Sequence, residues 1–554
     1  MHRVRTLSRG LLAAALLLHA FTALVVIGLR IRHPHDLEWM TGSVLDHVER
    51  VRMGEPLYTA PSARWIPFLY TPLFYWLGAV VGGGAFACRL ISVVASIAQG
   101  VFVWWAARAL GAKKAWAAAA VLVFVAAFPF VGFWYDLERG DNLCGALVMA
   151  GACALLRARS VRGHVLSGFL FVIAVLAKQQ AIFYLAGSGL GLLLAKRASD
   201  EPTRNRDLVG FGLAAGLPLV ALLALARAGD GWPSYYLVKM PRAHGVVLGL
   251  ADAVIWRDVP RGFLLVGVTV GATAVAALHV LRRTGGRRDT IAAAILITGF
   301  AGAVASRLHI GGWINVLIPW STCAAVAVGV SASRVEERFR TLAWIGLATA
   351  GAVLLQLLVW TYDPRPLVPS AASRADEERL RSEIAMLERN GEVLIPSRGH
   401  ISRVRHFHIS ALADVVRVDG HSPADLVSAL RSRSYAAVVD DARYHDFRTD
   451  DWPPTLLEDI DDLRTPLLSS YFVARRLPYG RRRLALQSPA TPAWVYLPRR
   501  VPLDVAPAEL RRRQLAEMKL ADVRARALAE GSEAPFTESE IEDLASLPEP
   551  APTP

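Results

Sequence analysis

The sequence predicts a multi-pass membrane protein: an all-α bundle of about eleven spanning helices, followed by a small α/β domain. The 554 residues are 54% hydrophobic, with a mean hydropathy of +0.36. The apolar residues come in runs of about 17–25, the length that crosses roughly 30 Å of hydrocarbon as a helix. The net charge of +14 lies largely in short basic clusters between these runs. Such clusters orient a membrane protein and do not favour nucleic acid as a partner.

The first apolar run is predicted to remain as a span. It is too long for the hydrophobic region of a signal peptide, and no small-residue cleavage site follows it. The predicted spans are residues 11–30, 86–107, 115–134, 142–156, 164–177, 181–195, 208–228, 262–281, 290–306, 313–331 and 341–361.

Lysine and arginine gather in every second connection between these spans. The basic connections contain Arg3, Arg5, Arg9, Arg108, Lys113, Lys114, Arg157, Arg159, Arg162, Lys196, Arg197, Arg204, Arg206, Arg282, Arg283, Arg287, Arg288, Arg334, Arg338 and Arg340. The other connections contain Asp36, Glu38, Asp46, Glu49, Glu55, Asp136, Glu138, Asp141, Asp230, Asp252 and Asp258. Because basic loops stay in the cytoplasm, an odd number of spans places the N-terminus inside and the C-terminal domain outside the plasma (inner) membrane.

One further apolar stretch, residues 67–84, is predicted not to span the bilayer. Counting it would invert every later loop and place the basic clusters outside. It is expected to be a helix that dips into the outer leaflet within a large first outer loop, residues 31–85. The membrane domain is therefore predicted to cover residues 1–361.

The polar C-terminal third is predicted to form a separate extracytoplasmic α/β domain over residues 362–504. Residues 375–390 have opposite charges at helical spacing, and residues 422–433 are predicted to be a helix capped by Ser422. Three short runs have the composition of strands: residues 391–396, 413–420 and 435–441. Residues 505–554 are expected to be a charged helix followed by a disordered acidic and proline-rich tail.

Charged side chains lie at the outer ends of several predicted spans. Because a charge at membrane depth costs free energy, a functional role is the first hypothesis for them. These outer ends and the large first outer loop carry Asp36-Leu37-Glu38, Gly54-Glu55-Pro56-Leu57-Tyr58, Tyr70-Thr71-Pro72-Leu73, Arg89, Glu138-Arg139-Gly140-Asp141, Lys178-Gln179 and Gly311-Gly312-Trp313-Ile314-Asn315. In this order the motifs resemble the GT-C superfamily of membrane glycosyltransferases, near the protein O-mannosyltransferases and the lipid A aminoarabinose transferases (glycosyltransferase family 39-like). The resemblance covers about residues 11–330.

This resemblance implies transfer of a sugar from a polyprenyl-phosphate donor to an extracytoplasmic lipid, glycan or protein acceptor, with inversion at the anomeric carbon. The first-loop match makes Asp36 the candidate general base, with Glu38 second, since an acceptor hydroxyl must lose its proton as it attacks. Asp141 matches the acid of the second loop, which orients the acceptor or, in metal-using relatives, holds a divalent cation. Cations at outer span ends are candidates for the donor phosphate: Arg89, Lys178, Arg307, His309 and, more loosely, Arg242.

Two other functions are compatible with a polytopic chain of this kind. A transporter or lipid flippase usually shows internal repeats and polar groups near the midplane, whereas these charges lie at span ends. A non-catalytic scaffold with an outer interaction domain is the second alternative. The histidine pairs His33/His35 and His406/His408 lack a third and fourth ligand at suitable spacing, so the sequence leaves the metal requirement open.

Overall fold

The chain divides into two compact units, described here from a computed structural model. The structure describes residues 2–198, 205–228, 230–282, 284, 286–339, 343–442, 455–477 and 491–529. Unit 1 comprises Met1–Pro34, Val51–Gly54 and Tyr70–Val368. Unit 2 comprises His35–Arg50, Glu55–Leu69 and Pro369–Pro554. Two segments of the predicted first outer loop thus belong to the same unit as the C-terminal region.

Unit 1 contains a helix at each of the predicted spans. These helices are α1 (His2–Arg30), α4 (Gly84–Ala109), α5 (Lys114–Ala126), α6 (Gly140–Arg157), α7 (Val161–Ala177), α8 (Ile182–Ala198), α9 (Asn205–Arg227), α14 (Phe263–Arg282), α15 (Arg287–Leu308), α16 (Ile318–Arg338) and α17 (Ala343–Val359). Among the described residues, six helices are long and apolar enough to cross a membrane. The chain is therefore a multi-pass membrane protein, and a total of about eleven crossings stays a prediction.

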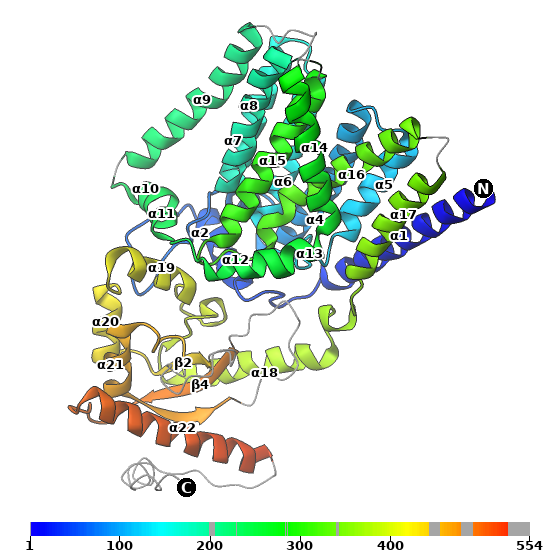
Figure 1. Cartoon of the computed structure of the whole chain (residues 1–554). Helices are drawn as coiled ribbons and strands as arrows, with labels where there is room; N and C mark the ends of the chain where they lie inside the picture. The colour runs from blue at the N-terminus through cyan, green and yellow to red at the C-terminus, as the bar shows by residue number, and fades with distance from the viewer. Residues whose placement is uncertain are drawn as a thin grey trace. The chain divides into compact units, whose positions relative to one another are not determined.

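Close helix contacts in unit 1 depend on small residues. Helix α8 packs along α15, and α6 lies between α4 and α7 (Figure 1). A Cβ atom on Gly187 of α8 would come within 2.9 Å of the Ala294 carbonyl oxygen of α15, and one on Gly329 of α16 within 2.6 Å of the Trp116 carbonyl of α5. Small residues allow helix backbones to approach in this way within a bilayer.

Short helices join the long ones. Residues 67–84 contain α3 (Leu73–Val80) and end on the first residue of α4; the eight residues of α3 span about 12 Å and cannot cross a bilayer. Insertion of α3 into the outer leaflet remains a prediction. Between α9 and α14 lie two helical stretches, each interrupted by a π-helical turn: α10 (Trp232–Ser234), η2 (Tyr235–Lys239) and α11 (Met240–Ala243), then α12 (Gly249–Ala253), η3 (Val254–Asp258) and α13 (Val259–Arg261).

Unit 2 contains a mixed sheet with helices around it. In its described part, the strands β1 (Val393–Leu394), β2 (Ala437–Ala442), β3 (Tyr471–Arg476) and β4 (Thr491–Pro498) form a sheet in the order β1-β2-β4-β3. The β1–β2 pair is parallel and the other two pairs are antiparallel. The main helices are α2 (Thr41–Arg52), of which residues 41–50 belong to unit 2, and α18 (Ala371–Leu387), α19 (Ile409–Asp419), α20 (Ala424–Arg431), α21 (Asp461–Ser470) and α22 (Pro507–Ala529).

The core of unit 2 follows the alternation of side chains along its strands. Leu380 and Ile384 of α18 pack with Val439 of β2 and Val495 of β4. Since neighbouring residues of a strand point to opposite faces, Tyr496 lies on the other face. There it accepts a hydrogen bond from Gln514 of α22.

Three predictions for this region were wrong in detail. The valine-rich run 413–420 is not a strand but the end of α19, because the apolar positions begin earlier and bury Ile409, Leu412 and Val415 at helical spacing. Helix α20 follows Pro423, and the hydroxyl of Ser422 donates to Asp462 Oδ1 at 2.7 Å instead of capping the helix. Only two residues of 391–396 form a strand. The predicted helix over 375–390 and the charged helix after 505 are both confirmed, and the predicted disordered tail lies outside the described residues.

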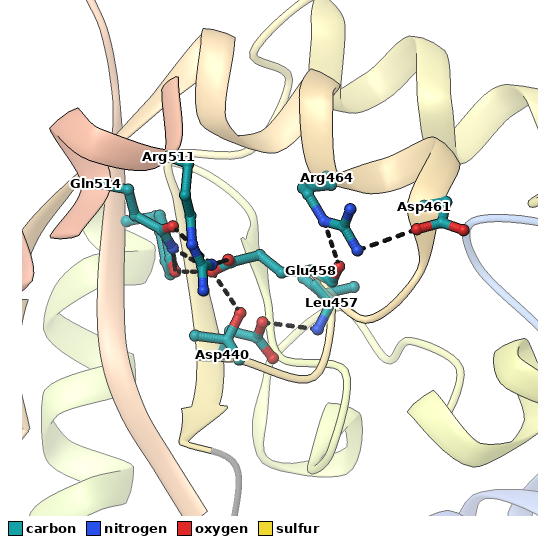
Figure 2. Close-up of polar contacts among 9 residues, drawn as sticks. Asp440, Leu457, Glu458, Asp461, Arg464, Arg511 and Gln514 are labelled. Carbon is teal, nitrogen blue, oxygen red and sulfur yellow. Dashed lines mark hydrogen bonds and ion pairs between the residues drawn. The ribbon is translucent and has the colours of Figure 1, made fainter. Parts of the chain in front are cut away.

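A buried carboxylate fixes α22 to the sheet. Glu458 accepts hydrogen bonds from Gln514 and, at 2.8 Å, from the Tyr496 hydroxyl, while Arg511 donates to its second oxygen at 2.9 Å (Figure 2). Burial raises the pKa of Glu458, and these donors oppose that rise. The network therefore joins a loop, a strand and the last described helix.

Asp440, beside this network, makes the stability of unit 2 depend on pH. Burial raises its pKa to about 8, although backbone N–H groups of Leu457 and Asp441 donate to it. The folded protein then holds a proton that the unfolded chain releases near pH 4, so stability falls as pH rises from about 4 to about 8. We expect Asp440→Asn to flatten this decline, which amounts to a few kcal/mol at most, when thermal unfolding of the purified chain is followed from pH 5 to 8.5.

The matched control is Asp461→Asn, since the Asp461 side chain is 92% exposed. This variant should keep the wild-type dependence on pH. An equally steep decline in Asp440→Asn would contradict the assignment.

Candidate functional site

Three carboxylates, two in the loop between α5 and α6 and one in the first turn of α6, are each paired with a cation from a different segment of unit 1. The three ion pairs are Arg30–Asp136, Arg89–Glu138 and Lys178–Asp141. The cations come from the end of α1, from α4 and from the residue that follows α7. Sequence reasoning identified the three carboxylates, Arg89 and Lys178, but it missed Arg30 and did not predict which charges pair.

The three pairs differ in their access to solvent. The side chains of Arg30, Asp136, Arg89 and Glu138 are all 0% exposed, whereas those of Lys178 and Asp141 are 14% and 6% exposed. An unpaired buried charge is strongly destabilising, so the two inner pairs hold the loop in place. The Lys178–Asp141 pair is the one of the three that is partly exposed.

The local backbone places Asp141 for this contact. It lies in the first turn of α6, where the helix N-terminus favours a negative charge. Gly140 allows the close approach, because a Cβ atom there would lie 2.7 Å from the carbonyl oxygen of Ala177. Asn315, which precedes α16, donates from Nδ2 to Asp141 Oδ1 at 2.9 Å. Three segments far apart in the sequence therefore meet at one carboxylate.

Arg139 adds a buried cation to this region. Its guanidinium lies over the rings of Trp134 and Tyr70, 5.3 Å and 5.6 Å from their centroids. Cation–π contacts of this kind fix the direction of a guanidinium without neutralising its charge. Arg139 is therefore a second buried cation close in sequence to Asp141.

The other predicted phosphate-binding residues fall into two groups. Arg89 is fully buried, and besides Glu138 it donates to the carbonyl oxygens of Arg30 and His33. It therefore acts in this structure as an internal support. Arg307 is buried too, with its Nε 3.0 Å from Asp258 Oδ2 and its Nη1 donating to the Gly312 carbonyl at 2.5 Å.

His309 and Arg242 are more accessible. Arg242 is exposed on α11 and His309 is half-buried just after α15. Backbone hydrogen bonds from Val247 N–H to the Leu308 carbonyl (2.8 Å) and from Ile310 N–H to the Gly245 carbonyl (3.3 Å) join their two segments. Residues 307–315 lead along the chain from His309 to Asn315, which donates to Asp141. The two backbone hydrogen bonds join this segment to the residues that follow Arg242.

Asp36 and Glu38 belong to unit 2. Asp36 is buried, and His400 Nε2 lies 3.0 Å from its Oδ2. Burial alone would raise the pKa of Asp36, but His400 and Arg398 hold it well below its usual range. Glu38 is also buried and accepts the backbone N–H of Met40 at 3.1 Å, next to the start of α2. Glu38 thus supports the local backbone, while Asp36 is kept as a carboxylate.

The surroundings of Asp141 do not fit a divalent cation. Its two partners are an ammonium and an amide nitrogen, both donors, where a hard cation needs oxygen ligands. Among the described residues, no three His, Cys, Asp or Glu side chains come together as a metal site.

Breaking an inner ion pair is expected to cost stability. Glu138→Gln leaves Arg89 buried without its counterion, which we expect to lower the free energy of unfolding by about 3–5 kcal/mol. The measurement is thermal unfolding of the detergent-solubilised protein, with Glu337→Gln, an exposed position, as the control. An unchanged unfolding temperature in Glu138→Gln would show that the pair does not hold the loop.

Apolar helices and charged pairs buried between them define a polytopic membrane protein, and comparison with solved structures identifies its fold. ArnT from Cupriavidus metallidurans in the apo state aligns with a TM-score of 0.51 and 16% identity, over 87% of this chain and 97% of that one. ArnT bound to undecaprenyl phosphate gives 0.49 and 15%, over 76% and 92%. The Archaeoglobus fulgidus oligosaccharyltransferase AglB, in complex with an inhibitory peptide and a dolichol-phosphate, gives 0.49 and 10%, over 90% and 75%. No family model and no curated protein matches the sequence.

The likeness to apo ArnT shows that the chain has a GT-C fold, as the order of its motifs predicts. At 16% identity this concerns the fold alone, because one fold hosts many functions. What the site does must be argued from its own residues.

Proposed function

We propose that the protein is a GT-C glycosyltransferase that moves a sugar from a polyprenyl-phosphate donor to an acceptor on the extracytoplasmic side of the membrane. The observation that carries this proposal is the Asp141–Lys178–Asn315 cluster at helix ends of a GT-C fold. The comparison structures with undecaprenyl phosphate and dolichol-phosphate are those of proteins that bind such lipids, which agrees with this donor class.

In this proposal Lys178 stabilises the leaving phosphate. The bond between the anomeric carbon and the phosphate oxygen breaks, and its electron pair leaves with the polyprenyl phosphate. A fixed cation at that oxygen lowers the barrier, because it meets charge that develops in the transition state. His309 and Arg242 extend the positive region along the donor. Arg307, paired with Asp258, supports the segment that carries His309, and Arg89 supports the loop that carries Glu138. The polyprenyl tail lies among the apolar helices.

Asp36 is the proposed general base. The acceptor oxygen forms the new bond to the anomeric carbon, and its proton passes to the Asp36 carboxylate. A single displacement of this kind inverts the anomeric configuration. Asp141 orients the acceptor, while Glu38 keeps the first-loop backbone in shape. The acceptor is a lipid, a glycan or a protein.

Mass spectrometry of lipids and envelope glycans tests this function in the cell. In a strain without the gene, one class of molecule should lose the mass of one sugar, and the wild-type gene should restore it. Restoration should fail with Asp36→Asn or Asp141→Asn. Unaltered glycans and glycolipids in the deletion strain would favour a scaffold, and accumulation of a solute without covalent transfer would favour a transporter.

A further inference from the structure

His400 stands beside the proposed base although nothing in the sequence connects the two. It lies in η7 (Gly399–Ile401), after the first strand of the sheet, and its Nε2 is 3.0 Å from Asp36 Oδ2. Both side chains are nearly buried, with 11% of His400 and 4% of Asp36 exposed. Both belong to unit 2, so this contact lies within one compact body.

Gly42 makes room for the imidazole. It lies in α2, and a Cβ atom there would be 1.8 Å from His400 Nδ1 and 2.0 Å from its Cε1. No side chain fits such a space unless the ring moves. The glycine therefore allows His400 to reach Asp36, and it offers a way to displace His400 without altering either partner.

We propose that His400 is the positioning residue of Asp36: its Nε2 holds one carboxylate oxygen in place and keeps the carboxylate ionised, so that the other oxygen can take the acceptor proton. This role rests on the proposed function of Asp36 as base. The imidazole itself receives no proton from the acceptor. It would fix the direction of the base, as an orienting group does in other acid–base pairs.

The electrostatics of the site agree with this role. Burial is the largest influence on the pKa of Asp36 and raises it, but His400 more than offsets burial together with Arg398 and Arg381. For Asp46, on α2, burial is the stronger influence. It raises the pKa of Asp46 to about 6, although His400 and Arg405 act to lower it. The charged and titratable groups around the pair are Asp46 and Glu49 of α2, His35 before it, Arg398 and Arg405 around η7, and Glu377, Glu378 and Arg381 of α18. Two buried carboxylates of one unit thus have pKa values shifted in opposite directions, and the imidazole lies 3.0 Å from the one proposed as base.

The test compares the pH dependence of sugar transfer in wild type, His400→Asn and Gly42→Ala. Without the imidazole, burial should raise the pKa of Asp36, so the acid limb of the kcat/KM profile should move up by at least one pH unit. Gly42→Ala should move it in the same direction by displacing the ring. His421→Ala, an exposed histidine of the same unit, and Gly212→Ala, a helical glycine with open space around it, should leave the profile unchanged. A general loss of rate with no shift of the limb would overturn the proposal.

A second readout does not depend on activity. In His400→Asn, a buried and ionised Asp36 lowers the free energy of unfolding at neutral pH. This loss of stability becomes smaller as pH falls and Asp36 takes up a proton. The difference in unfolding temperature from wild type should therefore be larger at pH 7.5 than at pH 4.5, and it should shrink further as pH falls toward the lowered pKa of Asp36 in wild type. It should lose this dependence in an Asp36→Asn background and keep it in an Asp46→Asn background. A constant difference at all pH values would mean that His400 is only a packing residue.

The two proposals fail in different ways. If wild type transfers no sugar, the proposed function fails, while the unfolding data still report on the pair. If wild type transfers sugar and Asp36→Asn does not, but His400→Asn keeps the wild-type profile, only the role of His400 is lost.

Discussion

Asp36→Asn is expected to lower the rate of sugar transfer by about 10²–10⁴-fold, the range that a positioned general base contributes. The amide has nearly the shape of the carboxylate, so donor binding and the fold should persist. It cannot accept the acceptor proton, however, and the attacking oxygen must then keep that proton through the transition state. The effect should appear in kcat with the KM for the donor little changed, measured as polyprenyl phosphate released in proteoliposomes.

A matched control for this variant lies in the same loop. Glu55 is a carboxylate that pairs with Arg50 at 2.8 Å and is 48% exposed. Glu55→Gln should transfer sugar at the wild-type rate. Asp36→Asn membranes that work as well as wild type would move the base elsewhere, with Glu38 as the next candidate.

The second large effect is expected from Lys178→Met, which should lower the transfer rate by about 10²–10³-fold, as the loss of one fixed charge at a developing anion does. Methionine keeps the length of the side chain but removes the ammonium and leaves Asp141 without its ion-pair partner. Lys178→Arg should retain part of the rate because it keeps the positive charge. Single-turnover release of polyprenyl phosphate separates this effect from product dissociation.

Lys196→Met provides the comparison. Lys196 is exposed near the C-terminal end of α8 and donates to Asn205 at 2.6 Å. Removing its charge should leave transfer intact, so an equal loss in both variants would point to a general effect on the bundle. Full activity of Lys178→Met would exclude this ammonium from the leaving-group site.

The helices could be predicted from the sequence because each apolar run is a local property. A run such as 208–228 is as long as a helix must be to cross the bilayer, and the structure has a helix there. The run 413–420 was wrongly predicted as a strand because valine favours strands. Its helical spacing becomes clear only when Ile409 is included. Ser422 misled in a similar way, since its hydroxyl is taken by Asp462, 40 residues later.

The site could be predicted only as a set of charges at outer helix ends. Asp141 and Lys178 were singled out one at a time, and the structure brings them together with Asn315. Which cation meets which carboxylate depends on which helices are neighbours, and no local pattern carries that information. Arg89 shows the limit most clearly, because its position suggests a phosphate ligand whereas Glu138 occupies its guanidinium.

The contact between Asp36 and His400 was the feature of the site least predictable from the sequence. His400 comes from a short turn more than 350 positions later and matches no motif. Only the folding of first-loop segments into the C-terminal unit brings the two together. No local pattern around Gly42 predicts the imidazole ring that it accommodates, because that ring comes from a segment far along the chain.

Transfer of sugar by the purified protein tests the central claim most directly. Proteoliposomes containing the full chain would receive polyprenyl-phosphate sugars together with lipid extract or envelope glycan, and both products would be weighed by mass spectrometry. We predict that one donor yields free polyprenyl phosphate and an acceptor heavier by one sugar with inverted anomeric configuration, and that Asp36→Asn yields neither. Intact donors with every acceptor tried, or products formed equally by the variant, would contradict the account.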